Sequence, residues 1–343
     1  MAKKREKIVM AISGGVDSAV ASLILKNQGY EVIGLFLRLS EKQPNSELSA
    51  RKVCQKLKIK FYPINAYQKF NKNVIQYFCS AYSRGLTPNP CVECNKKIKF
   101  GELLKYIKIL KADYLATGHY IRLQQKFPIK LFYGIDKDKD QSYFLYNLKQ
   151  KQLNHILFPL GGYTKAEVKK IAEKNKLPCE KNESQDICFL AGDHNDFLKK
   201  NIKLKPGSIK DLTGKILGQH LGLPLYTIGQ RKGIELGGTG PFYVVETDYK
   251  TNTLFVTNKK DHEKLLNSQL IAKNINWISG KVPKMPLNCT AKIRYGHEAE
   301  NCRVSLVKGK INVKFKKKQR AITPGQSVVF YKDKELLGGG IID

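Results

Sequence analysis

A short apolar run that ends in a glycine-rich loop constrains the fold of this chain more than any other feature. Residues 7–13 read KIVMAIS, and the glycine loop at 13–18 reads SGGVDS. Apolar residues then recur at helical spacing over 16–27, and 31–39 (EVIGLFLRL) is a second apolar run. Strand, helix and strand within roughly 30 residues make a βαβ unit. The sequence therefore predicts a parallel sheet with helices on its faces.

The glycine loop lies at a strand-to-helix junction, where open parallel sheets bind ligands. Its two glycines permit tight turns and close approach of an anion, and the following helix offers unpaired N–H groups. The hydroxyls of Ser13 and Ser18 can donate to phosphate oxygens, whereas Asp17 would hold Mg²⁺ or orient the loop. We expect the nucleotide to be bound here, by Ala11, Ile12, Ser13, Gly14, Gly15, Val16, Asp17 and Ser18.

The rest of the chain predicts a three-domain protein, since 343 residues are too many for one ordinary core. A helical pattern at 98–110, a strand at 112–117 and a capping box at Thr164 and Glu167 complete the first domain. We expect a doubly wound α/β domain over 1–203 and a small α+β domain over 204–268. Alternating β-rich runs then predict an antiparallel β-barrel over 269–343.

The chain is strongly basic, with 61 Lys and Arg against 29 Asp and Glu and a net charge of +32. Such a field attracts polyanions, although lysines on solvated faces account for part of the excess. No apolar run reaches the roughly 20 residues of a membrane span, and the first residues do not form a secretory signal. We expect a cytoplasmic protein without a membrane partner, and the charge indicates an RNA or DNA partner.

The eight cysteines are scattered, which argues against a disulfide framework. Cys91 and Cys94 form a Cys-x-x-Cys pair in TPNPCVECN, and Cys188 lies in SQDICF. A thiol at a helix N-terminus has a favoured thiolate, so we expect accessible thiols of low pKa here. One Cys-x-x-Cys pair supplies too few ligands for structural zinc. Three thiols fit either a sulfur relay or an iron–sulfur cluster.

Several strings occur in an order typical of one enzyme family. They are TPNPCVECNKKIKF (87–100), ATGHY (116–120), KDQSYFL (139–145), FPLGGYTKAEVKKIA (158–172), ESQDICF (183–189), YTIGQRKGI (226–234), RYGH (294–297) and PGQSVVFY (324–331). The chain resembles the tRNA-uridine 2-sulfurtransferase family, also called tRNA-specific 2-thiouridylase, over nearly its whole length. The glycine loop resembles the pyrophosphate loop of the ATP pyrophosphatases, which attach AMP to a carbonyl oxygen.

The resemblance implies ATP-dependent, Mg²⁺-assisted thiolation of the wobble uridine of tRNA, so the expected nucleic-acid partner is tRNA and not DNA. ATP would adenylate the C2 oxygen. Cys188 would carry a persulfide received from an upstream sulfur-donor protein. Cys94 would be the nucleophile that completes sulfur release, which leaves a transient Cys94–Cys188 disulfide. Leu37 and Gly118 would contact the nucleotide. Contacts with the target base or the tRNA would come from Asn89, Pro90, Cys91, His119, Lys139, Asp140, Gln141, Arg294, Tyr295 and Gln326.

Cys91 departs from the family pattern, which most often has aspartate there. One hypothesis is that Cys91, Cys94 and Cys188 ligate a [4Fe–4S] cluster that carries the transferred sulfide; the other is a persulfide relay in which Cys91 takes no part. Two other functions also fit the loop. A lysidine-type or amidating ligase needs no paired thiols, and a non-catalytic RNA-binding protein would bind tRNA without ATP turnover.

Overall fold

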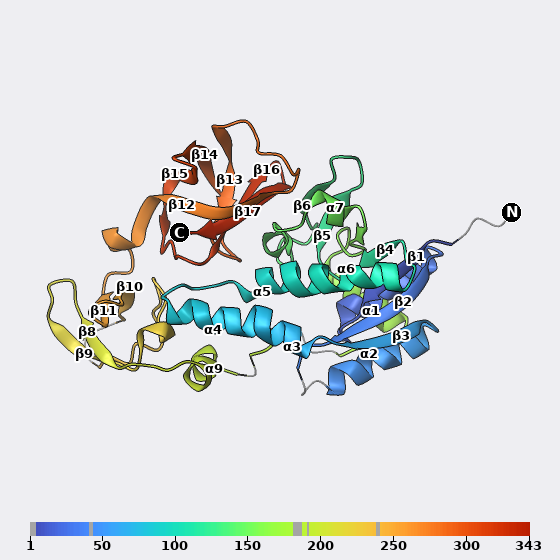
Figure 1. The fold of residues 1–343 in the computed structure, drawn as a ribbon, viewed down its shortest axis with the longest axis horizontal. Coiled ribbons are helices and arrows are strands. Elements are labelled where there is room, and N and C mark those ends of the chain that lie inside the picture. Colours follow the sequence, from blue (N-terminus) through green and yellow to red (C-terminus); the bar gives the residue numbers. More distant parts are fainter. Residues whose placement is uncertain (1–4, 41–43, 181–186, 191, 238–240) are drawn as a thin grey trace.

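A computed structural model describes residues 5–40, 44–180, 187–190, 192–237 and 241–343. Residues 183–186 of the string ESQDICF therefore lie outside the described residues. Figure 1 shows an N-terminal parallel-sheet domain, a small β domain at the far end of the long axis, and a C-terminal barrel that lies beside α4 to α6. This arrangement confirms the predicted fold class.

The N-terminal domain is built on a five-stranded parallel sheet. Its strands, in spatial order, are β3 (Lys60–Asn65), β2 (Glu31–Arg38), β1 (Lys7–Ala11), β4 (Tyr114–Ala116) and β7 (Ile156–Leu157). Successive side chains of a strand point to opposite faces. Ile8 accordingly packs with α1 (Val16–Asn27) and α8 (Lys165–Lys174), whereas Val9 packs with α6 (Phe100–Ile109). The predicted βαβ unit is confirmed. The glycine loop follows β1, the central strand of the sheet.

The helices that border the sheet include two π-helical stretches that the sequence did not predict. α2 (Pro44–Lys56) packs beside β2 and β3. α3 (Tyr67–Phe70), the π-helix η1 (Asn71–Ile75) and α4 (Gln76–Ser83) form one rod, and α5 (Pro90–Glu93), the π-helix η2 (Cys94–Lys99) and α6 form another. The predicted capping box is confirmed, because Thr164 and Glu167 each accept from the other's backbone N–H.

The central domain is a four-stranded sheet with one helix against it. The strand order is β10 (Tyr243–Asp248), β11 (Thr253–Thr257), β8 (Gly207–Lys210) and β9 (Ile216–His220). Leu198 of α9 (His194–Asn201) shares its core with Phe78 and Tyr82 of α4. A 3₁₀ turn, η4 (Leu223–Leu225), contacts both helices. The far end of the α4 rod therefore anchors this domain to the first.

Six antiparallel strands close into the C-terminal barrel. They are β12 (Leu266–Trp277), β15 (Lys310–Arg320), β14 (Glu300–Val307), β13 (Leu287–Lys292), β16 (Ser327–Lys332) and β17 (Glu335–Ile342), and β17 pairs back onto β12. The predicted barrel is confirmed. η5 (Glu263–Leu265) leads into it. No helix within the described part of the chain is both long and apolar enough to cross a bilayer.

An unpredicted hairpin of the first domain joins the barrel sheet. β5 (Ile121–Gln124) pairs with β6 (Lys130–Tyr133), and Leu131 of β6 pairs with Leu336 of β17. Tyr143 on η3 (Ser142–Phe144) donates to the Ser327 carbonyl at 2.9 Å across the same junction. Gln150, at the start of α7 (Gln150–Leu153), donates to the Ile278 carbonyl at 2.7 Å. The barrel is thus bonded to the domain that carries the glycine loop.

Candidate active site

The glycine loop is held in shape by its own serine. Ser18 Oγ donates to the Gly15 carbonyl at 3.0 Å and accepts from the Ser13 N–H at 3.1 Å. Gly14 has a φ of +88°, and a Cβ there would collide with the Ser46 carbonyl oxygen. Helix α1 begins after Gly15 with no side-chain cap. The first N–H groups of α1 therefore need another acceptor, which a phosphate can supply.

Asp17 is fixed by two residues that sequence reasoning missed. Lys165 Nζ donates to its two carboxylate oxygens at 2.7 and 2.8 Å, and the Tyr120 hydroxyl donates at 2.6 Å. Of the two roles expected for Asp17, this geometry favours orienting the loop, since both oxygens are engaged by the protein. Tyr120 and Lys165 lie in the strings ATGHY and FPLGGYTKAEVKKIA, which were the only sequence signal for them.

Gly118 and His119 adjoin the glycine loop from the end of β4. A Cβ on Gly118 would lie 3.1 Å from the Ser18 nitrogen, so a larger residue would crowd the loop. His119 Nδ1 is 2.7 Å from Thr117 Oγ1, and its Nε2 is 3.5 Å from Lys99 Nζ. An ammonium only donates, so Nε2 is the acceptor and Nδ1 carries the proton. Burial and Lys99 lower the pKa of His119 well below 6.5, which keeps the ring neutral.

Cys94 lies inside the protein, at the first position of η2. Its side chain is 6% exposed, and burial raises the pKa of its thiol to about 12, with Lys99 acting in the opposite direction. The helix starts earlier, at Pro90, where Asn89 Oδ1 accepts from the Val92 N–H at 3.3 Å. The expectation of an accessible thiol of low pKa is therefore wrong for Cys94 in this conformation, because burial outweighs any helix-terminus effect.

Cys188 is exposed and approaches the same region from another segment. Phe189 packs against Phe70 at a ring-centroid distance of 5.8 Å, in the apolar cluster that also contains Cys94 and the partly buried Leu37. The surrounding protein raises the pKa of the Cys188 thiol, and the charge of Lys99 lowers it. Both predicted catalytic cysteines are thus within the field of one cation.

The π-helical form of η2 explains how Lys99 comes to act on Cys94. In an α-helix, a residue five positions on is rotated by about 140° from the first. In a π-helix residue i is hydrogen-bonded to residue i+5. Lys99 therefore lies one turn after Cys94, close to the same face of the helix. Sequence reasoning missed Lys99, because nothing in the sequence after the Cys-x-x-Cys pair indicates a π-helical turn.

The three cysteines proposed as cluster ligands do not form a metal site. Over the ranges that the structure describes, no three His, Cys, Asp or Glu side chains are grouped so that they could hold a metal ion. Cys94 is buried, Cys91 is partly buried and Cys188 is exposed, so the three thiols differ in environment. The described residues therefore give no support to a [4Fe–4S] cluster.

The loop that precedes the Cys-x-x-Cys pair joins all three domains. Gln326 Nε2 of the barrel donates to the Thr87 carbonyl at 3.0 Å, and Thr87 Oγ1 is 3.2 Å from Thr227 Oγ1 of the central domain. Tyr295 of the barrel packs on Phe144 at 4.4 Å, and the Phe144 carbonyl accepts from Asn95 Nδ2 at 3.2 Å. The C-terminal strings singled out in the sequence therefore reach the cysteine segment.

Several expected tRNA contacts have side chains that bond within the protein. Asp140 is buried and accepts from Ser142 Oγ at 2.6 Å and the Gly134 N–H at 3.0 Å, and burial raises the pKa of its carboxyl. Gln141 Oε1 accepts from the Tyr120 N–H at 3.1 Å. The Asp140 carboxylate is thus not the exposed charge expected of the 139–141 loop; Lys139 beside it is partly buried. Arg294 is partly buried, with Nη2 3.4 Å from Thr323 Oγ1.

The parallel sheet, the glycine loop at the carboxyl end of β1 and the uncapped start of α1 define an α/β domain with an anion-binding loop. The chain matches the models for the tRNA methyl transferase HUP domain over residues 6–192, the tRNA methyl transferase PRC-barrel domain over 195–258 and the aminomethyltransferase beta-barrel domain over 267–342. Each model matches one part of the chain, whereas whole proteins match it over 98–100% of its length.

It is 44% identical to a tRNA-specific 2-thiouridylase of Thermoanaerobacter sp. (strain X514), over 98% of both chains. It is 42% identical to that of Idiomarina loihiensis, over 100% of this chain and 97% of the relative. The figure for the relative from Protochlamydia amoebophila is 40%, over 99% of this chain and 94% of that one. The chain belongs to the tRNA-specific 2-thiouridylase family, as its sequence motifs predicted.

Proposed function

We propose that this enzyme uses ATP to replace the C2 oxygen of the wobble uridine of tRNA with sulfur. One observation carries the proposal: two contacts and the charge of one lysine connect the glycine loop with the thiols. Gly118 abuts the loop at Ser18, the adjacent His119 meets Lys99 at 3.5 Å, and Lys99 acts on both Cys94 and Cys188. An oxygen activated on the loop would therefore be close to a sulfur source.

In the first step, the uridine C2 oxygen attacks the α-phosphorus of ATP, and pyrophosphate leaves. Gly14, Gly15 and the start of α1 would bind the phosphates, with Mg²⁺ neutralising their charge when it is bound. Ala11, Ile12, Val16 and Leu37 would line the nucleotide site from β1, α1 and β2. Asp17 would keep the loop in shape through Lys165 rather than act on the substrate.

In the second step, the terminal sulfur of a Cys188 persulfide attacks C2, and AMP leaves. The Cys94 thiolate then attacks the Cys188 sulfur, which releases 2-thiouridine and forms a Cys94–Cys188 disulfide. An external thiol must reduce that disulfide, and a sulfur-donor protein must reload Cys188. Exposure of Cys188 suits reloading, whereas burial of Cys94 requires a movement that uncovers it when tRNA binds.

The target base would enter beside Asn89, Pro90 and Cys91, next to the neutral ring of His119. Asn95, the neighbour of Cys94, has a buried Oδ1 that accepts no hydrogen bond in the described part of the protein. This oxygen suits an N–H donor of the base, since unpaired buried acceptors are costly. Lys139, Arg294 and Tyr295 would contact the tRNA directly. Asp140, Gln141 and Gln326 would position the loops around them.

The thiols distinguish this function from that of a ligase or a non-catalytic RNA-binding protein. The test is nucleoside mass spectrometry of tRNA from cells that lack this protein, complemented with wild type, Cys94→Ser or Cys188→Ser. We expect wobble 2-thiouridine to be lost and to return with wild type alone. Unchanged 2-thiouridine in the deleted strain, or full rescue by both variants, would contradict the proposal. Anaerobic purification with iron and sulfide analysis tests the persulfide route, for which we expect active protein without iron.

A further inference from the structure

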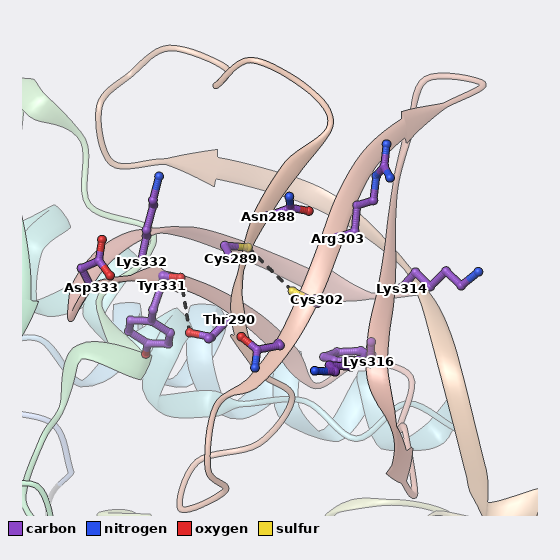
Figure 2. Close-up of a pocket in the computed structure, with 12 residues that line it drawn as sticks. Asn288, Cys289, Thr290, Cys302, Arg303, Lys314, Lys316, Tyr331, Lys332 and Asp333 are labelled. Carbon is purple, nitrogen blue, oxygen red and sulfur yellow. Dashed lines mark hydrogen bonds between the residues drawn. The ribbon is translucent and has the colours of Figure 1, made fainter.

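Two cysteines of the barrel, outside the active site, form a close pair. Cys289 on β13 and Cys302 on β14 are directly opposed, with their sulfurs 3.7 Å apart. Figure 2 shows the two thiols facing each other across the strands, in the wall of a hollow on the barrel. Opposed residues of antiparallel strands have Cα atoms about 4.5–5.5 Å apart, a spacing that a disulfide can bridge.

The hollow is positively charged. Arg303, Lys314, Lys316 and Lys332 line it, against a single carboxylate from Asp333. Arg303 and Lys314 are themselves paired across β14 and β15. Such a field concentrates small anions at the hollow. The two thiols themselves are buried among the apolar residues of the barrel core, and the hydrogen bond to Cys289 together with burial raises the pKa of the Cys302 thiol.

We propose that Cys289 and Cys302 are a thiol–disulfide exchange site for anionic low-molecular-weight disulfides, and that their cross-link clamps the hairpin between them. That hairpin carries Arg294 and Tyr295 at its tip. The exchange chemistry stands on the cysteine pair alone, whereas its effect on tRNA rests on the proposed function. The sulfur relay at Cys94 and Cys188 does not use this pair.

The exchange takes place in two displacements. The Cys289 thiolate attacks one sulfur of the disulfide RSSR, the S–S bond breaks, and one RS⁻ leaves and takes up a proton. Cys302 then loses its proton to solvent and attacks the Cys289 sulfur, which forms the protein disulfide and expels the second RS⁻. The protein gives up two electrons, and RSSR is reduced to two RSH. Cys302 is assigned to the second step, because its hydrogen bond to Cys289 and its burial raise the pKa of its thiol.

The clamped hairpin leads to the active site. The residues between β13 and β14 include Tyr295, whose ring packs 4.4 Å from that of Phe144. The Phe144 carbonyl in turn accepts from Asn95, the neighbour of Cys94. Closing the sulfurs from 3.7 Å to a bond of about 2.05 Å pulls the two strands at the base of this hairpin together, so the tip should move less freely against Phe144 and adapt less well to tRNA.

The experiment uses the full-length Cys94→Ser/Cys188→Ser protein, so that the proposed sulfur relay cannot respond and the barrel pair is compared only with Cys54, Cys79, Cys91 and Cys179. Glutathione disulfide, which is anionic, and cystamine, which is cationic, are applied at equal concentration, and the products are mapped by peptide mass spectrometry. We expect a Cys289–Cys302 cross-link that forms about tenfold faster with glutathione disulfide at low salt, with the difference shrinking as salt screens the charges. Adding Cys302→Ser should arrest the reaction at a mixed disulfide on Cys289, and adding Cys79→Ser should change nothing.

Hydrogen exchange and tRNA binding measure the clamp. Oxidation should slow amide exchange over 293–299 by about tenfold, since a cross-link restricts local opening. It should weaken tRNA binding several-fold, reversibly with dithiothreitol. Absence of the cross-link, equal rates with cystamine, or a cross-link without any change in exchange or binding would overturn the inference. If the reduced protein bound no tRNA, the proposed function would fail. Peptide mapping would still decide whether the cysteine pair reacts with disulfides, and hydrogen exchange would still decide whether the cross-link restricts the hairpin.

Discussion

Gln326 of the barrel donates a hydrogen bond of 3.0 Å to the backbone carbonyl of Thr87, at the start of the segment that carries Cys91 and Cys94. The two residues are 239 positions apart in the chain. The Thr87 N–H in turn donates to the Pro324 carbonyl at 2.9 Å. The barrel therefore fixes the backbone that leads into the cysteine helix, in addition to any contact that it makes with tRNA.

Gln326→Ala removes the donor to Thr87 and should loosen this segment. We expect thiolation to fall several-fold, and unfolding free energy to fall by about 1 kcal/mol, the net worth of one such hydrogen bond. Single-turnover thiolation with saturating tRNA separates this effect from weaker tRNA binding. Gln269→Ala, at an exposed position of β12, is the matched control and should behave as wild type. A Gln326→Ala defect seen only in tRNA affinity would point to direct contact instead.

Lys165→Met leaves the Asp17 carboxylate without its two ammonium hydrogen bonds. The loop should lose its fixed geometry, so we expect ATP consumption to fall by one to two orders of magnitude, equivalent to about 1.4–2.8 kcal/mol of lost transition-state stabilisation. Tyr120→Phe removes only the 2.6 Å hydroxyl bond and should cost less. The measurement is tRNA-dependent pyrophosphate release. Lys170→Met, exposed on the same helix, controls for loss of surface charge; equal rates for both lysine variants would refute the role assigned to Lys165.

Lys99→Met should make both active-site thiols harder to ionise. Lys99 lowers the pKa of Cys94 and of Cys188 against the effect of burial, so its removal raises both pKa values further. Alkylation by iodoacetamide below the pKa depends on the thiolate fraction, and one unit of pKa is tenfold in that fraction. We expect both cysteines to react about threefold to tenfold more slowly near pH 8, with the rates converging as pH rises.

Peptide-resolved alkylation kinetics distinguish a charge effect from a structural one. Lys99→Arg retains the cation and should retain most of the reactivity, whereas Lys97→Met, exposed on the same π-helix, should leave both rates unchanged. A Lys99→Met protein whose thiols react as in wild type at every pH would show that this ammonium does not act on them.

The local parts of the fold could be predicted from the sequence because short-range patterns encode them. The strand, glycine loop and α1 follow from one apolar run and one helical period, and Thr164 and Glu167 encode their own cap within one turn. The barrel followed from alternating runs with turns between them. The β5–β6 hairpin was missed because its strands are short and acquire their place only by pairing with β17, far along the chain.

The site residues that escaped prediction depend on contacts between distant segments. Asp17 and Lys165 are 148 positions apart, and no periodicity connects them. The resemblance identified the cysteines and led us to expect accessible thiols. Burial of Cys94 depends on Phe70 and Val74, which come from the other helical rod. A π-helical turn has no sequence signature that would have placed Lys99 one turn from Cys94.

His119 should make the protein less stable as the solution becomes acidic. Its pKa in the folded state lies well below 6.5, because burial and Lys99 disfavour the charged ring. Below about pH 6.5 the unfolded chain binds a proton at His119 that the folded chain does not bind. The free energy of unfolding therefore falls with decreasing pH, by up to about 1.4 kcal/mol per pH unit. His119→Gln cannot titrate and should show a shallower decline between about pH 7 and pH 5.

Urea unfolding across that pH range checks the sign and the size of the His119 effect. His194, His220 and His297 also have lowered pKa values, so the variant should retain part of the acid sensitivity. His155→Gln, at an exposed position, is the control and should decline as steeply as wild type. If His119→Gln declined just as steeply, the ring would have to be protonated in the folded state. The tautomer that accepts from Lys99 and donates to Thr117 would then be wrong as well.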